Sequence, residues 1–218
     1  MGKGGVTTEE AQGKALVDAA LAAGVKHFVY TSVDRGGDAS STTSTDVPHF
    51  LSKHNIEQHL VEKAKGTDMR YTILRPVAFM ENFTPSFFGK VFGAAWRTTL
   101  PADQGMQLVS VRDVGHFAAQ AFRNPDTRAG KGISLAGDEV TFKQAGEVFR
   151  EKAGVPLPET WGIFGRGLMW ASHDMERMMN FIGKGGYKAD IAGLRREHPG
   201  LLSLGEYLER HSAWAKKD

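Results

Sequence analysis

His27-Phe-Val-Tyr-Thr-Ser-Val33 is a short run of β-branched and aromatic residues. Such a run, without polar alternation, is typical of a strand that is buried on both faces, as the strands of parallel sheets are. The segment before it predicts a helix, because Thr7 and Glu10 have the spacing of a capping box and Gly24 can end the helix. A helix that leads into a buried strand is half of a βαβ unit.

The chain downstream of this strand repeats the same order of elements. Residues 34–47 are rich in Gly, Ser, Thr and Asp and predict a long surface loop. Pro48 suits the first turn of a helix that ends near Gly66, and Arg70-Tyr-Thr-Ile-Leu-Arg-Pro76 predicts a second buried strand. Gly132-Ile-Ser-Leu-Ala136 predicts a third strand. Since a right-handed strand–helix–strand crossover places its strands parallel, we expect an α/β fold with a parallel sheet of about three strands and flanking helices.

The C-terminal part of the sequence predicts helices and no strand of any length. A capping box at Thr141 opens a helix that Gly154 closes. Two further helices are expected near residues 172–181 and 203–214. We therefore expect a single domain over residues 1–218, with the sheet in residues 1–140 and an α-rich lobe in residues 141–218.

The composition of the 218-residue chain excludes several classes of function. The sequence contains no cysteine, which excludes disulfides, thiolate nucleophiles and zinc sites with Cys ligands. The formal net charge is +2 and the 27 basic residues are scattered, so we expect no direct contact with nucleic acid. No apolar run approaches the roughly 18 residues of a membrane span, and His54 and His59 lack the spacing of paired metal ligands. We expect a cytoplasmic protein without a bound metal or membrane contact, which as a regulator would also enter the nucleus.

Several segments occur in the order that short-chain dehydrogenases have at their strand ends. These segments are Val25-Lys-His-Phe-Val-Tyr-Thr-Ser32, His49-Phe-Leu-Ser-Lys53 with Glu57, Tyr71-Thr-Ile-Leu-Arg-Pro-Val-Ala-Phe-Met-Glu-Asn-Phe83 and Leu108-Val-Ser-Val-Arg-Asp-Val-Gly115. Through nearly its whole length the chain resembles the NmrA-like group of atypical short-chain dehydrogenases/reductases. The resemblance implies an NADP(H)-binding Rossmann sheet with a small substrate or partner lobe above the strand ends. The group includes fungal nitrogen-repression regulators, redox sensors and some quinone or dye reductases.

Two departures from the family pattern limit what the resemblance implies. Family members begin with a strand, a G-x-x-G-x-x-G turn and a helix, whereas here Gly2-Lys-Gly-Gly5 has no strand before it. We expect an N-terminally truncated Rossmann half with low affinity for NADP or NAD, because the backbone N–H groups of that turn hold the pyrophosphate. In the second departure, His49 occupies the position of the general-acid tyrosine that dehydrogenases place four residues before a lysine, here Lys53.

The resemblance also implies the residues of a site. Catalytic roles fall on Ser32, His49 and Lys53, whose hydroxyl, imidazole and ammonium groups we expect to converge at the carboxyl edge of the sheet. The alternative to a catalytic role for His49 is that it only lines an inert pocket. The alternative to substrate contact for the aromatic residues after Pro76 is packing in the hydrophobic core. Cofactor contacts are expected from Thr31, Ser32, Lys53, Pro76 and Val77. Contacts with a substrate of unknown identity are expected from Phe79, Glu81, Asn82 and Phe83.

Three functions stay open. The first is an NAD(P)-sensing regulatory protein of the NmrA type, at most weakly catalytic, that acts through a partner such as a transcription factor. The second is an NAD(P)H-dependent reductase of quinone-like or aromatic substrates. The third is an interaction or scaffold protein: without upstream strands, the edge of the strand at 27–33 would be unpaired and would recruit a protein partner or a second copy of the chain.

Overall fold

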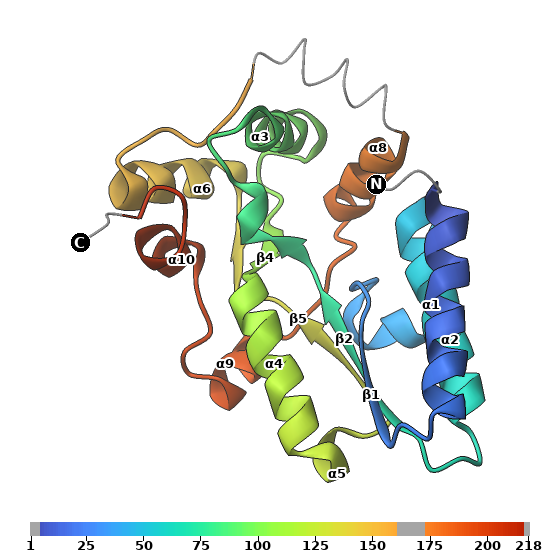
Figure 1. The fold of residues 1–218 in the computed structure, drawn as a ribbon. Coiled ribbons are helices and arrows are strands. Elements are labelled where there is room, and N and C mark those ends of the chain that lie inside the picture. Colours follow the sequence, from blue (N-terminus) through green and yellow to red (C-terminus); the bar gives the residue numbers. More distant parts are fainter. Residues whose placement is uncertain (1–4, 161–172, 216–218) are drawn as a thin grey trace.

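The computed structural model describes residues 5–160 and 173–215, and a parallel sheet lies at its centre (Figure 1). The strands of this sheet are β1 (His27–Thr31), β2 (Arg70–Pro76) and β5 (Lys131–Leu135). Their order is β1-β2-β5, and both neighbouring pairs are parallel, with His27 opposite Arg70. This arrangement confirms the expected α/β fold with three parallel strands.

Helices cover both faces of this sheet (Figure 1). They are α1 (Gly5–Ala22), α2 (Pro48–Ala64) and α4 (Val111–Arg123). The first two pack side by side, and α4 packs against β1 and β2. Neighbouring side chains of β2 enter different apolar clusters, because Ile73 packs with Leu60 of α2, whereas Leu74 shares the main core with Phe117 of α4. The strand is therefore buried on both faces, as its sequence without polar alternation predicts.

A second, smaller sheet follows the carboxyl end of the first, and the sequence does not predict it. Its strands are β3 (Ala78–Phe79), β4 (Met106–Val109) and β6 (Asp138–Val140). Strand β4 pairs with β3 in parallel and with β6 antiparallel. Strands this short contain too few residues to show a period of two. The backbone passes from β2 to β3 through Val77 and from β5 to β6 through residues 136–137, so two connections join the sheets.

The remaining elements are helical. They are α3 (Phe87–Thr99), α5 (Pro125–Arg128), α6 (Phe142–Val148), α8 (His173–Gly183), α9 (Ile191–Glu197), α10 (Leu204–Arg210), the 3-10 turns η1 (Gly37–Ser41) and η2 (Met80–Asn82), and the π-helical turn η3 (Phe149–Ala153). Capping boxes at Thr141 and Ser203 open α6 and α10, and Gly154 follows η3 with a φ of 68°. Of the expected C-terminal helices, α8 begins just past residue 172, which lies outside the described residues, and α10 ends at Arg210, before residue 214. None of the described helices has the length and apolar character needed to cross a membrane.

An aromatic cluster joins α3 to the C-terminal lobe. Phe83 lies at its centre, with its ring 5.4 Å from that of Phe92, 6.0 Å from Trp96 and 5.5 Å from Phe149. Each of these four side chains is at most 1% exposed. Since Phe149 belongs to η3, the packing of the segment after β3 and the packing of the lobe depend on one another.

Candidate functional site

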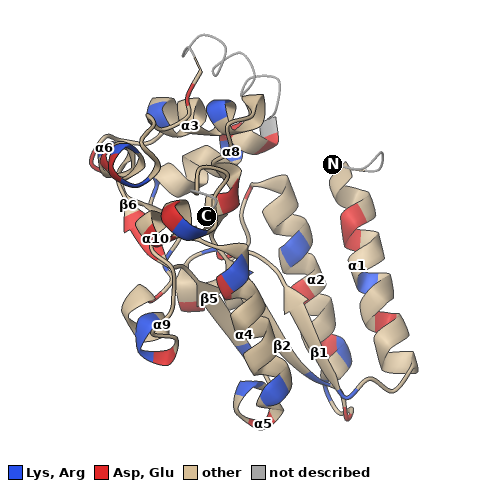
Figure 2. Cartoon of the chain, turned by 60° about the vertical axis from the view of Figure 1, so that its left-hand side comes forward, with Lys and Arg blue, Asp and Glu red and all other residues tan. Residues whose placement is uncertain are grey.

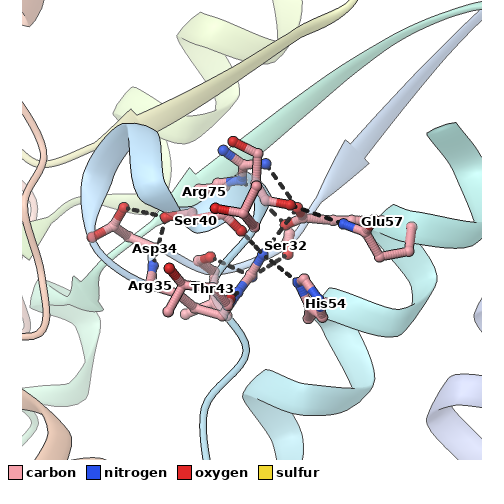
Figure 3. A network of polar contacts seen from close by, with 12 residues as sticks. Ser32, Asp34, Arg35, Ser40, Thr43, His54, Glu57 and Arg75 are labelled. Atoms are coloured by element: carbon pink, nitrogen blue, oxygen red, sulfur yellow. Dashed lines mark hydrogen bonds and ion pairs between the residues drawn. The ribbon is translucent and has the colours of Figure 1, made fainter.

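A buried polar network lies directly after β1 (Figure 3). At its centre is Arg35, which is 2% exposed. The Arg35 guanidinium donates to the backbone oxygens of Val33 at 2.9 Å, Ser40 at 2.6 Å and Thr43 at 3.1 Å. The loop thus folds around a buried cation, and the prediction of a surface loop over residues 34–47 is wrong for its first residues.

Glu57 of α2 is the anion of the network. Its Oε2 accepts from Nη2 of Arg35 at 3.0 Å and from Nη2 of Arg75 at 2.8 Å, and its Oε1 accepts from Nε of Arg75 at 3.2 Å. Glu57 is 1% exposed and Arg75 is 4% exposed. Burial opposes ionisation of Glu57, but the hydrogen bonds from Arg75 and Arg35 outweigh it and lower the pKa of this carboxyl below its usual value. The carboxylate is therefore held in its charged form between two guanidinium groups.

Asp34 connects the loop after β1 to two distant parts of the chain. Its fully buried carboxylate accepts hydrogen bonds from the backbone N–H of Gly37 at 2.8 Å, the hydroxyl of Ser134 at 2.5 Å and the backbone N–H of Lys188 at 2.9 Å. Gly37 has a φ of 63°, and a Cβ at this position would lie 2.4 Å from the backbone oxygen of Lys188. Both facts require glycine there. One carboxylate thus joins the end of β1, strand β5 and the segment before α9.

The three predicted catalytic side chains each have a different partner. Ser32 is 4% exposed, and its Oγ accepts a hydrogen bond from the central guanidinium of the network at 3.3 Å. His49 Nδ1 lies 2.6 Å from Oδ2 of Asp174 on α8, and Lys53 Nζ donates to Oε1 of Glu9 on α1 at 2.6 Å. Within residues 5–160 and 173–215, no hydrogen bond or ion pair joins any two of the three. Their catalytic roles stay predictions.

The predicted cofactor contacts other than Lys53 lie at the carboxyl ends of β1 and β2. Thr31 is exposed, whereas Ser32, Pro76 and Val77 are buried. Backbone groups at this edge already bond within the sheet: Ser32 N donates to a β2 carbonyl at 2.7 Å and Val77 N donates to a β5 carbonyl at 3.2 Å. Thr31 is therefore the most accessible of the four at this edge.

The predicted substrate contacts follow β2 in sequence. Phe79 and Asn82 are half-buried, and Phe83 lies in the aromatic cluster. Glu81 Oε1 accepts hydrogen bonds from the hydroxyl of Ser110 at 2.8 Å and from the backbone N–H of Val111 at 3.1 Å. Glu81 thereby satisfies donors at the first turn of α4. The roles of these four residues in substrate contact stay predictions.

The network around Glu57 is the feature that sequence reasoning missed as a site. Two signals in the sequence point to it, namely a carboxylate next to the apolar positions of a predicted helix and an arginine inside a predicted buried strand. Because charged groups are buried only when they are paired, Glu57 and Arg75 could have been matched to each other. No comparable signal marks Arg35, which follows the strand in a polar, glycine-rich segment.

A parallel sheet with helices on both faces, and with polar side chains gathered where its strands end, defines a Rossmann-like α/β protein. The family model described as "NmrA-like family" matches residues 2–190. The chain belongs to the NmrA-like family, as the sequence motifs predicted.

Two curated proteins illustrate this relationship. The chain is 27% identical over 188 residues to the "NmrA-like family domain-containing oxidoreductase lnbB" of Aspergillus flavus, which covers 76% of the chain and 54% of that protein. It is 31% identical over 159 residues to the "Nitrogen metabolite repression protein nmr" of Neurospora crassa, which covers 68% of the chain and 32% of that protein. The chain therefore spans about half of the first relative and about a third of the second.

Solved structures share the fold. NmrA, a negative transcriptional regulator, in complex with NADP has a TM-score of 0.67 and 18% identity, with 93% of this chain and 69% of that chain covered. The Citrobacter sp. triphenylmethane reductase complexed with NADP(H) has a TM-score of 0.69 and 18% identity, with 96% of this chain and 74% of that chain covered. At this level of identity the likeness shows the fold alone.

Proposed function

We propose that this chain belongs to an NAD(P)-sensing regulatory protein that is at most weakly catalytic and acts through a protein partner. The observation that carries the proposal is that the general-acid tyrosine implied by the family resemblance is replaced by His49. The Nδ1 atom of His49 lies 2.6 Å from Oδ2 of Asp174. Lys53, one helical turn later, is bonded to Glu9 and not to a phenol. Binding of a dinucleotide needs no proton transfer, so the loss of the phenolic oxygen is compatible with a sensor.

The names of the relatives support a regulatory role and also a reductive one. The Neurospora crassa relative is a nitrogen metabolite repression protein, and the solved NmrA is a negative transcriptional regulator. The Aspergillus flavus relative is an oxidoreductase, and the Citrobacter sp. protein is a triphenylmethane reductase. Since the last of these and NmrA were both solved with NADP, we include a nicotinamide dinucleotide in the proposal for this chain.

The described residues fit only one end of such a dinucleotide. Thr31 is exposed at the carboxyl end of β1, and Lys53 of α2 is partly exposed with its ammonium bonded to Glu9. The helices α2 and α4, which follow β1 and β4, begin at Pro48 and Val111, and no glycine lies within the ten residues before Pro48 or the five before Val111 to form a turn that could hold a pyrophosphate. When bound, the nicotinamide supplies a hydride donor or acceptor. We therefore expect this chain to bind NADP or NAD with low affinity.

Calorimetric titration with NADPH and NADH tests the sensor proposal. We expect saturable binding, and Lys53→Ala should weaken it about tenfold or more, because a hydrogen bond to a charged group contributes about 1.5–3 kcal/mol. Lys63→Ala is the matched control, since Lys63 lies on the same helix with a half-exposed side chain and should leave the affinity unchanged. If neither dinucleotide binds, this chain is neither a sensor nor a reductase.

The alternative function is an NAD(P)H-dependent reductase of quinone-like or aromatic substrates. The observation that favours it is the 2.6 Å contact between His49 Nδ1 and Asp174 Oδ2, because general acid–base sites often pair a histidine with a carboxylate. Oxidation of NADPH in the presence of a quinone panel separates the two functions. Turnover that His49→Ala abolishes would establish the reductase, whereas dinucleotide binding without turnover supports the sensor.

We also propose that the chain associates with itself through the free edge of β1. Within the described residues β1 is an edge strand of the first sheet, and Leu16 of the nearby helix α1 is 61% exposed. Unpaired N–H and C=O groups along an edge strand pair readily with another strand. Helices α1 and α2 each carry charges of both signs (Figure 2). Light scattering of the purified chain is expected to give a dimer, and a monodisperse monomer contradicts the proposal.

A further inference from the structure

A cavity of about 320 Å³ lies between α2, η1 and the first sheet. Its walls include Glu57, Gln58 and Val61 of α2, Tyr71 and Arg75 of β2, and Gly132 of β5. None of the residues expected to touch the dinucleotide or the substrate lines this cavity. The volume falls at the lower end of the range of about 300–1,000 Å³ that is typical of small-molecule sites.

Arg75 brings an unused hydrogen-bond donor to this cavity. Its Nε and Nη2 donate to Glu57, whereas its Nη1 has no hydrogen-bond partner among the residues that the structure describes. The residue is 4% exposed, so water from the surface reaches little of it except through the cavity. Gly132 makes room for the guanidinium, because a Cβ at that position would lie 2.5 Å from Nη1.

The charged residues that line the cavity are Asp38, Glu57 and Arg75. Arg35 and Arg75 are both buried and share the single carboxylate of Glu57, at 3.0 Å and 2.8 Å. Arg75 is paired with Glu57 through Nε and Nη2, so an anion in the cavity would accept a charge-assisted hydrogen bond from the remaining nitrogen, Nη1. Asp38 lies exposed at the rim and repels anions that carry several charges. The site therefore favours a ligand with one negative charge.

We propose that this cavity binds a small organic carboxylate. The carboxylate accepts from Nη1 of Arg75, and the hydrocarbon or aromatic part of the ligand packs against Val61, Tyr71 and Ile73, which also line the cavity. A single inorganic ion would leave most of the space empty, since a water molecule occupies only about 30 Å³ in the liquid. The cavity is distinct from the dinucleotide site of the proposed function, because the two share no residue.

Titration of the full chain with benzoate, acetate and inorganic phosphate, at low chloride and monitored by NMR, tests the proposal. Benzoate is expected to bind with a dissociation constant on the order of 1 mM, as suits a ligand of its size. Acetate should bind more weakly because it lacks the ring, and phosphate should bind more weakly because of its second charge. Arg75→Gln should weaken benzoate binding about tenfold or more, since it removes a charged donor.

Two further variants keep the test decisive. Gln58→Trp fills the cavity from an exposed position of α2 without removing a member of the ion pairs, and it should abolish benzoate binding even if Arg75→Gln fails to fold. Arg70→Gln on the same strand is the control, because Arg70 pairs with Asp126 outside the cavity. Absence of benzoate binding, equal binding by all variants, or tighter binding of phosphate than of benzoate would each overturn the proposal.

Discussion

Replacing Glu57 with alanine is expected to lower the free energy of unfolding by about 3–5 kcal/mol, as is typical when one partner of a buried ion pair is removed. The physical reason is that Arg35 and Arg75, at 2% and 4% exposed, would lose their shared carboxylate and stay buried as unpaired cations. The loop after β1 would also be held less firmly. The Arg35 guanidinium binds three of its carbonyl groups and would lose its own ion pair to α2. Urea unfolding followed by circular dichroism measures the change.

Glu62→Ala is the matched control for this prediction. Glu62 lies on the same helix α2, and its exposed carboxylate pairs with Lys65 at 2.6 Å. Exposed ion pairs of this kind contribute about 0–1 kcal/mol, so the control should unfold almost as the wild type does. Equal losses in the two variants would mean that the buried network does not stabilise the fold.

Phe83→Ala is expected to cost about 3–5 kcal/mol of stability, the range for truncating a buried phenylalanine. The substitution would leave a void among Phe92, Trp96 and Phe149, all of them at most 1% exposed. Because these rings belong to α3 and η3, the lobe should loosen together with the segment after β3. Differential scanning calorimetry would record the lowered midpoint.

Phe87→Ala provides the comparison for Phe83→Ala. Phe87 begins α3 four residues later and is 61% exposed, so its truncation should change stability by no more than about 0.5 kcal/mol. A large effect at Phe87, or a small one at Phe83, would contradict the burial assigned to the aromatic cluster.

The parts of the fold that could be predicted from the sequence are those with strong local patterns. Strands β1 and β2 are continuous runs of β-branched and aromatic residues between helical segments, which predicts strands of a parallel sheet. The expected burial on both faces is confirmed for β2 but wrong for β1, which is an edge strand among the described residues, half-buried and with Thr31 exposed. The capping box at Thr141 likewise predicts the first turn of α6. The second sheet could not be predicted, because its strands are stabilised by pairing between distant segments such as Leu108 with Asp138.

The candidate site was harder to predict than the fold, because its contacts are not local. His49 is paired with a residue 125 positions away, and Lys53 with one 44 positions away. No spacing rule covers such distances, so the sequence could place these side chains near a sheet edge but not name their partners. The family resemblance supplied the roles of these residues, and only coordinates could supply the network around Glu57.

The passage of β2 into β3 and of β5 into β6 has a mechanical consequence. Two covalent connections side by side make a poor hinge, since rotating one sheet against the other would have to bend Val77 and residues 136–137 together. Both connections are also clamped, because Val77 N and Gly137 N donate to backbone carbonyls of neighbouring strands at 3.2 Å and 2.7 Å. The two sheets therefore form one rigid unit. A ligand that binds along the strand ends would change the positions of side chains and loops and would not rotate one sheet relative to the other.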